Sequence, residues 1–102
     1  MQAIIRGRKY DTTTAAFIAK RQWGTDGEGQ RWLLEALYRK TTGEYFLAGT
    51  GGADTRYACH PAPGEWAPGA KIIPVDPATA AAWCESNIPV EAYEALFGEV
   101  PE

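Results

Sequence analysis

The chain contains few of the residues that usually build metal and catalytic sites. Its 102 residues include one histidine, His60, and two cysteines, Cys59 and Cys84. Two cysteines exclude a scaffold of several disulfide bridges, and Cys59 and His60 are adjacent, whereas paired zinc ligands lie about two to four residues apart. The adjacency also argues against Cys59 as a nucleophile with His60 as its base, because neighbouring residues on an extended chain point apart. We expect no cofactor, no metal, no catalytic centre and free thiols, with Cys84 in the core.

Long hydrophobic runs are also missing. No apolar run approaches the roughly 18 residues of a membrane span, and residues 1–10 lack the apolar stretch of a signal peptide. We therefore expect a cytoplasmic protein. A content of 45% hydrophobic and 12% aromatic residues is not that of a disordered tail, and the length predicts a single domain over 1–102.

Basic residues are absent from the last third of the chain. Residues 1–71 contain ten basic and seven acidic side chains, whereas residues 72–102 contain six acidic side chains and no basic one. This asymmetry is consistent with a solvated acidic surface that keeps a small domain soluble. It is also consistent with an acidic face that docks on a basic surface of another protein. The candidate contact residues are Asp76, Glu85, Glu91, Glu94 and Glu99.

The first third of the chain predicts short elements. Residues 2–6 are β-branched and favour a strand. Asp11 and Thr12 can cap a short helical turn over residues 13–19, although a strand over 16–23 is the alternative. The three glycines and two acids of residues 24–30 predict a mobile loop.

Residues 31–49 form the clearest pattern, a β-hairpin that turns at Thr41-Thr42-Gly43. Residues 32, 34, 36 and 38 give one wholly apolar face, and residues 33, 35, 37 and 39 give a mixed one. A helix over 32–40 is the alternative. The GTGG string at 49–52 lacks the Lys-Ser/Thr and the context of a phosphate loop, so it predicts a turn or close backbone packing.

The second half predicts a long loop, a strand and two helices. Residues 53–70 form the loop, and residues 71–75 form a strand in which Pro74 marks an edge or an end. Asp76 and Pro77 are typical of a helix start, and a second helix begins at Pro89 and ends at Gly98. The overall prediction is an α+β domain, an antiparallel sheet of about four strands with two C-terminal helices on one face.

A basic and aromatic strip near the N-terminus supports a different function. It could stack on single-stranded nucleic acid, as in an accessory protein of a phage or mobile element, or it could be a solvated sheet edge protected by Lys and Arg. Its members are Arg6, Arg8, Lys9, Lys20 and Arg21 with Tyr10 and Trp23.

Several strings resemble a family of small proteins from phages and bacterial mobile elements. These are YDTTTA at 10–15, LYRKTTGEYFL at 37–47 followed by GTGG, IIP at 72–74, and a later AW at 82–83. The family includes anti-CRISPR proteins, and the chain is similar to one directed at a type I-C system. We expect the residues of these motifs to have structural roles, in turns and in the packing of the sheet. They are Tyr10, Asp11, Tyr38, Gly43, Tyr45, Phe46, Gly51, Gly52 and Trp83.

The resemblance implies a non-enzymatic inhibitor in the cytoplasm of an infected or lysogenic bacterial host. It would bind Cas proteins of a type I (Cascade-type) surveillance complex and block target DNA binding, with no direct contact to nucleic acid. The net charge of −3 is modest for a DNA mimic. An acidic patch, rather than an acidic surface overall, would have to make the contact.

Overall fold

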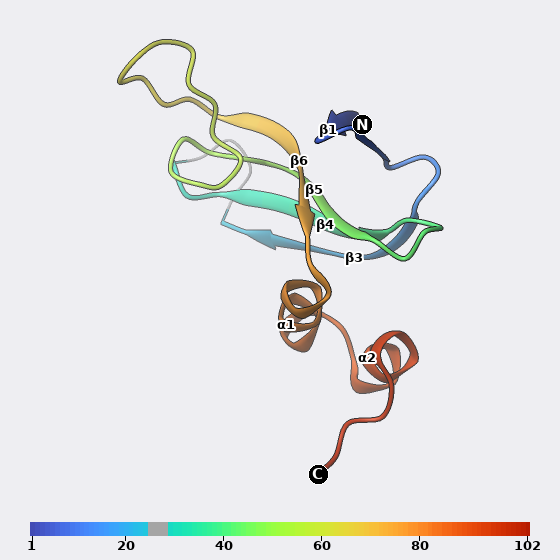
Figure 1. The fold of residues 1–102 in the computed structure, drawn as a ribbon. Coiled ribbons are helices and arrows are strands. Elements are labelled where there is room, and N and C mark those ends of the chain that lie inside the picture. The colour runs from blue at the N-terminus through green and yellow to red at the C-terminus, as the bar shows by residue number, and fades with distance from the viewer. Residues whose placement is uncertain (25–28) are drawn as a thin grey trace.

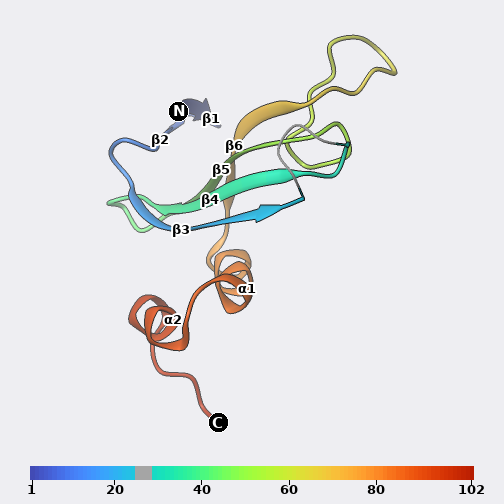
Figure 2. The same cartoon turned by 180° about the vertical axis from the view of Figure 1, so that it is seen from behind.

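The computed structural model describes residues 1–24 and 29–102 and has an α+β fold in three layers. A four-stranded sheet lies in the middle, a two-stranded hairpin lies on one side of it and two helices lie on the other (Figures 1 and 2). The elements are β1 (Gln2–Ile5), β2 (Arg8–Asp11), β3 (Ala16–Trp23), β4 (Leu33–Arg39), β5 (Tyr45–Gly51), β6 (Gly69–Val75), α1 (Pro77–Asn87) and α2 (Val90–Phe97).

The central sheet is antiparallel throughout, in the order β3-β4-β5-β6. The predicted hairpin is confirmed: β4 pairs with β5 in a register that places Leu37 opposite Leu47, and the helical alternative is wrong. Gly43 has a φ of 94° in the connecting turn, a conformation that favours glycine. Pro74 lies in the edge strand β6, as predicted, and edge strands are where proline is tolerated in a sheet.

A second hairpin, β1–β2, was not predicted as such. The sequence indicated a strand over 2–6 but not its partner, because the turn is formed by Arg6 and Gly7, both at positive φ. The hairpin covers one face of the sheet through aromatic contacts. Tyr10 meets Phe46 edge-on with ring centroids 5.5 Å apart, and Phe46 stacks on Tyr38 at 5.3 Å.

The helical turn expected over 13–19 is wrong, and the alternative strand is right. Asp11 does act as a cap, since its carboxylate accepts hydrogen bonds from the backbone N–H and the hydroxyl of Thr13 at 2.9 and 2.7 Å. These bonds hold only a turn, because β3 begins at Ala16 and pairs with β4 as far as Trp23. Pairing along this strand outweighs the local helical signal. Residues 25–28, the centre of the predicted loop, lie outside the described residues.

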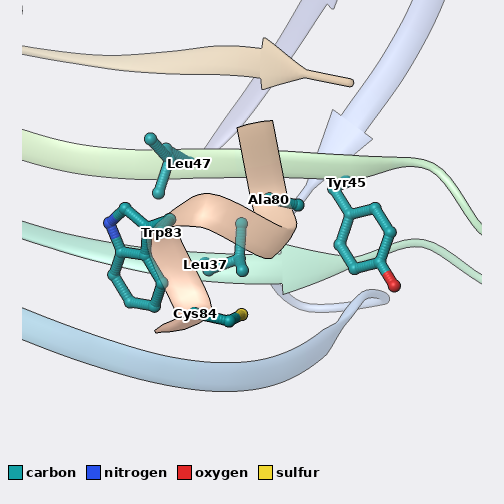
Figure 3. Close-up of a cluster of buried hydrophobic side chains, with 6 residues drawn as sticks. All are labelled: Leu37, Tyr45, Leu47, Ala80, Trp83 and Cys84. Carbon is teal, nitrogen blue, oxygen red and sulfur yellow. The ribbon is translucent and has the colours of Figure 1, made fainter. Parts of the chain in front are cut away.

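Both C-terminal helices occur where the sequence predicts them. The Asp76 carboxylate caps α1 by accepting from the Thr79 N–H at 2.7 Å, and Gly98 ends α2 with a φ of 93°. Helix α1 buries Ala80, Trp83 and Cys84 against Leu37, Leu47 and Tyr45 of the sheet. In Figure 3 the indole of Trp83 lies at one end of this cluster and the ring of Tyr45 at the other.

The long segment between β5 and β6 projects beyond the end of the sheet (Figure 1). Its regular pairing is limited to a bridge between Cys59 and Ala67. Strand β6 begins at Gly69, two residues before the predicted start. Within the GTGG string, a Cβ on Gly52 would lie 2.6 Å from the Gln30 carbonyl oxygen, and one on Gly51 would collide with Thr55. Close backbone packing, rather than phosphate binding, therefore accounts for these glycines.

Candidate functional site

A buried polar site surrounds the carboxylate of Glu35, which accepts three side-chain hydrogen bonds. Glu35 is buried, with 1% exposure, in the middle of β4. Its Oε1 accepts hydrogen bonds from Arg21 Nε at 2.7 Å and from Trp83 Nε1 at 2.9 Å. Its Oε2 accepts from the Tyr57 hydroxyl at 2.6 Å, and Arg56 lies 3.8 Å from the same oxygen. We call these five residues the Glu35 network.

Four separate parts of the chain position this network. Arg21 is directly opposite Glu35 in the β3–β4 register, and both side chains face the helical layer. Trp83 reaches the carboxylate from α1, so the network ties the helix to the sheet. Tyr57 arrives from the loop after β5 and lies over Gly49, where a Cβ would come within 2.7 Å of the tyrosine ring. The absence of a side chain at Gly49 therefore lets Tyr57 reach Glu35.

The network keeps the buried carboxylate ionised. Burial alone raises the pKa of Glu35, but hydrogen bonds from Tyr57, Trp83 and Arg21 and the charge of Arg56 outweigh burial, so the pKa is lowered. Burial and the adjacent Glu35 carboxylate raise the pKa of the Tyr57 hydroxyl well above its ordinary value. The hydroxyl is therefore a hydrogen-bond donor at neutral pH, not a nucleophile or a base.

Sequence reasoning missed this network. It assigned the buried face of β4 to the apolar residues, yet Leu34 on that face is 36% exposed while Glu35 and Leu37 on the mixed face are buried. The two helices cover the mixed face and the smaller β1–β2 hairpin covers the other. The available signal was a single acid inside a run of large apolar residues, opposite a glycine.

The predicted acidic residues do not all lie together. Glu85 and Glu94 line one hollow of about 360 Å³ with Ile88, Val90, Tyr93 and Val100, which we call the acidic hollow. Glu91 and Glu99 are exposed on or just after α2. Asp76 is separate: it caps α1 and lines a different hollow beside Tyr10 and Tyr45. The acidic residues that remain as candidates for a shared surface are therefore Glu85, Glu91, Glu94 and Glu99.

These C-terminal acids have no basic partner among the described residues. The ion pairs that the structure describes join Arg8 and Lys40 to Glu44, Arg21 and Arg56 to Glu35, and Arg31 to Asp54. Each of these acids precedes residue 72. Of the later acids, Glu94 accepts the Val100 backbone N–H at 3.0 Å, which positions the segment after α2 beside the hollow. The negative charge of α1 and α2 is thus left facing solvent.

The basic and aromatic strip predicted near the N-terminus is not gathered on one surface. Arg21 faces the helices, where Glu35 binds it, while Lys20 lies on the other face of β3. Tyr10, in β2, is 5% exposed, packs against Phe46 and has Lys40 over its ring, so it is not available for base stacking. Trp23, at 68% exposure, remains open to solvent at the end of β3.

The cysteines and the histidine do not form a cluster. Both thiols are free; Cys59 is exposed and Cys84 is buried, where burial raises the pKa of the Cys84 thiol. His60 packs edge-on against Trp66 with ring centroids 4.0 Å apart. In the part of the chain that the structure describes, no three His, Cys, Asp or Glu side chains gather as metal ligands, and neither helix is long and apolar enough to cross a membrane.

The chain matches no protein-family model, no curated protein and no solved structure.

Proposed function

We propose that this protein is a non-enzymatic inhibitor that docks on a basic surface of another protein through the acidic residues of α1, α2 and the segment after them. The partner that fits the sequence resemblance is a Cas protein of a type I surveillance complex. Binding would cover Lys and Arg side chains that otherwise hold the phosphates of target DNA, and so block DNA binding.

The acidic hollow is the single observation that carries this proposal. Glu85 and Glu94 flank an apolar floor that includes two exposed valines, Val90 at 69% and Val100 at 54% exposure. Carboxylates beside an apolar surface fit the long apolar stem and charged head of an Arg or Lys side chain. Because these acids have no basic partner among the described residues, docking would break no ion pair within the protein.

An electrophoretic shift assay tests the function. Purified type I-C surveillance complex is mixed with labelled target duplex in the presence and absence of excess protein. We expect the protein to abolish the shifted band. The inhibition should weaken as the salt concentration is raised, because salt screens the attraction between an acidic surface and a basic one. A surveillance complex that shifts the duplex equally well with excess protein contradicts the proposal.

A charge-reversed double variant tests the surface. Glu85→Lys with Glu91→Lys changes two exposed side chains that make no described hydrogen bond or ion pair, so the fold should survive. We expect inhibition at least tenfold weaker than that of the wild type. Glu65→Lys, a reversal at an exposed loop position, is the matched control and should inhibit normally. Equal potency of the double variant and the control would contradict a contact through the acidic residues of α1 and α2.

The same preparations distinguish the nucleic-acid alternative. A protein that binds labelled single-stranded DNA directly at low salt, without the surveillance complex, would favour the accessory-protein function instead. We expect no such binding, because Tyr10 and Arg21 of the proposed strip are engaged within the fold.

A further inference from the structure

A second cavity, distinct from the acidic hollow, lies between α1 and the sheet. It has a volume of about 280 Å³. Arg21, Arg56, Trp83, Thr79, Ser86 and Asn87 line it, and we call it the arginine cavity. Its remaining walls are aliphatic side chains, and no acidic side chain of residues 1–24 or 29–102 lines it.

The arginine cavity is lined by two positive charges, and one neighbouring carboxylate balances only one of them. Two guanidinium groups, Arg21 and Arg56, lie beside one carboxylate, that of Glu35. That carboxylate already accepts three hydrogen bonds, two of them from the neutral donors Tyr57 and Trp83. One positive charge is therefore left without a counter-charge among the described residues.

The guanidinium groups also have unused donors. Arg21 donates only its Nε to Glu35, so its two terminal nitrogens have no described acceptor. Arg56 comes no closer than 3.8 Å to the carboxylate and makes no hydrogen bond with any described residue. Both side chains are partly open to solvent, at 35% and 45% exposure, so a ligand can reach them.

Glu35 holds the guanidinium of Arg21 in place. The Glu35 side chain is fully buried and bonded to both a helix and a loop, and its short bond to Arg21 fixes the plane of that guanidinium. A guanidinium with a fixed plane matches the paired oxygens of a carboxylate or phosphate. The aliphatic and indole walls reduce the screening of such a contact by water.

We propose that the arginine cavity is a binding site for a small oxyanion, a phosphate or carboxylate group, held between Arg21 and Arg56. The exposed hydroxyls of Thr79 and Ser86 at the rim of the cavity provide further polar contacts. The volume suffices for such a group with water around it, since one water takes about 30 Å³ in the liquid. The site is independent of the acidic hollow and of the function proposed for it.

The indole N–H of Trp83 provides a direct measurement. It is bonded to Glu35 at the wall of the cavity, whereas Trp66 is 63% exposed on the distant loop and provides an internal control. Inorganic phosphate, and separately acetate, is titrated into the isotope-labelled protein at pH 7, with ionic strength held by chloride. We expect saturable shifts of the Trp83 indole signal with at least one of the two anions and no shift of the Trp66 signal. The anion that binds more tightly identifies the source of the oxyanion.

Matched arginine variants complete the test. Arg56→Gln removes the guanidinium that makes no hydrogen bond within the described fold, so the variant should fold. We expect it to bind at least tenfold more weakly. Arg31→Gln, at an exposed surface pair with Asp54, should bind as the wild type does. Wild-type protein with no saturable shift for either anion, or equal binding by the Arg56 and Arg31 variants, would overturn the proposal.

Discussion

Replacing Glu35 with glutamine tests whether the Glu35 network stabilises the fold as an ionised unit. The substitution keeps the shape of the side chain and removes its charge. One end of the amide can still accept from Arg21 and Trp83, but the other end presents an N–H₂ group to the Tyr57 hydroxyl and to Arg56. Hydrogen bonds to a charged group contribute about 1.5–3 kcal/mol and neutral ones about 0.5–1.5 kcal/mol. Breaking a buried ion pair costs about 3–5 kcal/mol.

We therefore expect Glu35→Gln to lower the free energy of unfolding by about 3 kcal/mol at pH 7, within the range set by those two effects. The loss also has a defined pH dependence. The pKa of Glu35 is lowered by folding from its ordinary value of 4.5. Its contribution is thus fully present above that value and is lost as the pH falls through the lower pKa of the folded state. The difference between wild type and variant should be constant from pH 6 to 8 and should narrow below about pH 4.5.

Urea unfolding followed by circular dichroism measures both effects, because urea, unlike guanidinium, does not screen charges. A loss of about 3 kcal/mol corresponds to a midpoint lower by about 1–3 M urea. Glu65→Gln, at an exposed acid outside the network, is the control and should unfold like the wild type. A Glu35→Gln protein within 1 kcal/mol of wild type, or a difference that persists unchanged to pH 3, would refute the assignment of an ionised, stabilising carboxylate.

Three further substitutions or reactions test the surrounding structure. Gly49→Ala should destabilise the fold by about 1–3 kcal/mol in the same urea assay, because the added Cβ would meet the ring of Tyr57 and the Leu34 carbonyl; an unchanged midpoint would contradict the close packing. Asp76→Ala should lower the free energy of unfolding by about 1 kcal/mol, because it removes the cap of α1. Asp76→Asn keeps a capping oxygen and should retain most of that stability. A thiol reagent should modify Cys59 rapidly and Cys84 only after unfolding; two equally fast thiols would place Cys84 outside the core.

The elements that could be predicted from the sequence are those with strong local signals. The β4–β5 hairpin has alternating apolar residues and a Thr-Thr-Gly turn, and α1 has an Asp-Pro start with a run of alanines. Both are determined by residues close together in the chain. The helical turn predicted after Asp11 was wrong because the competing signal, pairing of β3 with β4, comes from residues 10 to 23 positions away.

The Glu35 network could not be predicted for the same reason. Its members are spread from Arg21 to Trp83, and the bond between Glu35 and Trp83 spans 48 residues. No spacing rule links such positions, and the apolar alternation in β4 pointed to the opposite face of the strand. Which face of β4 is more deeply buried depends on how much of the sheet each outer layer covers. The two helices cover more of it than the four-residue strands of the β1–β2 hairpin do. That comparison requires the tertiary structure.

The pairing of charges, rather than the net charge, determines what a partner can contact. The acids Glu35, Glu44 and Asp54 are held by basic residues from the first 71 positions, so their charge is largely compensated within the fold. The acids of α1, α2 and the following segment have no basic residue in their part of the sequence and no basic partner among the described residues. The negative electrostatic field that would attract a basic surface therefore originates mainly at α1, α2 and the segment after them. A net charge of −3 understates that field, because the basic residues that reduce it lie in the earlier part of the chain.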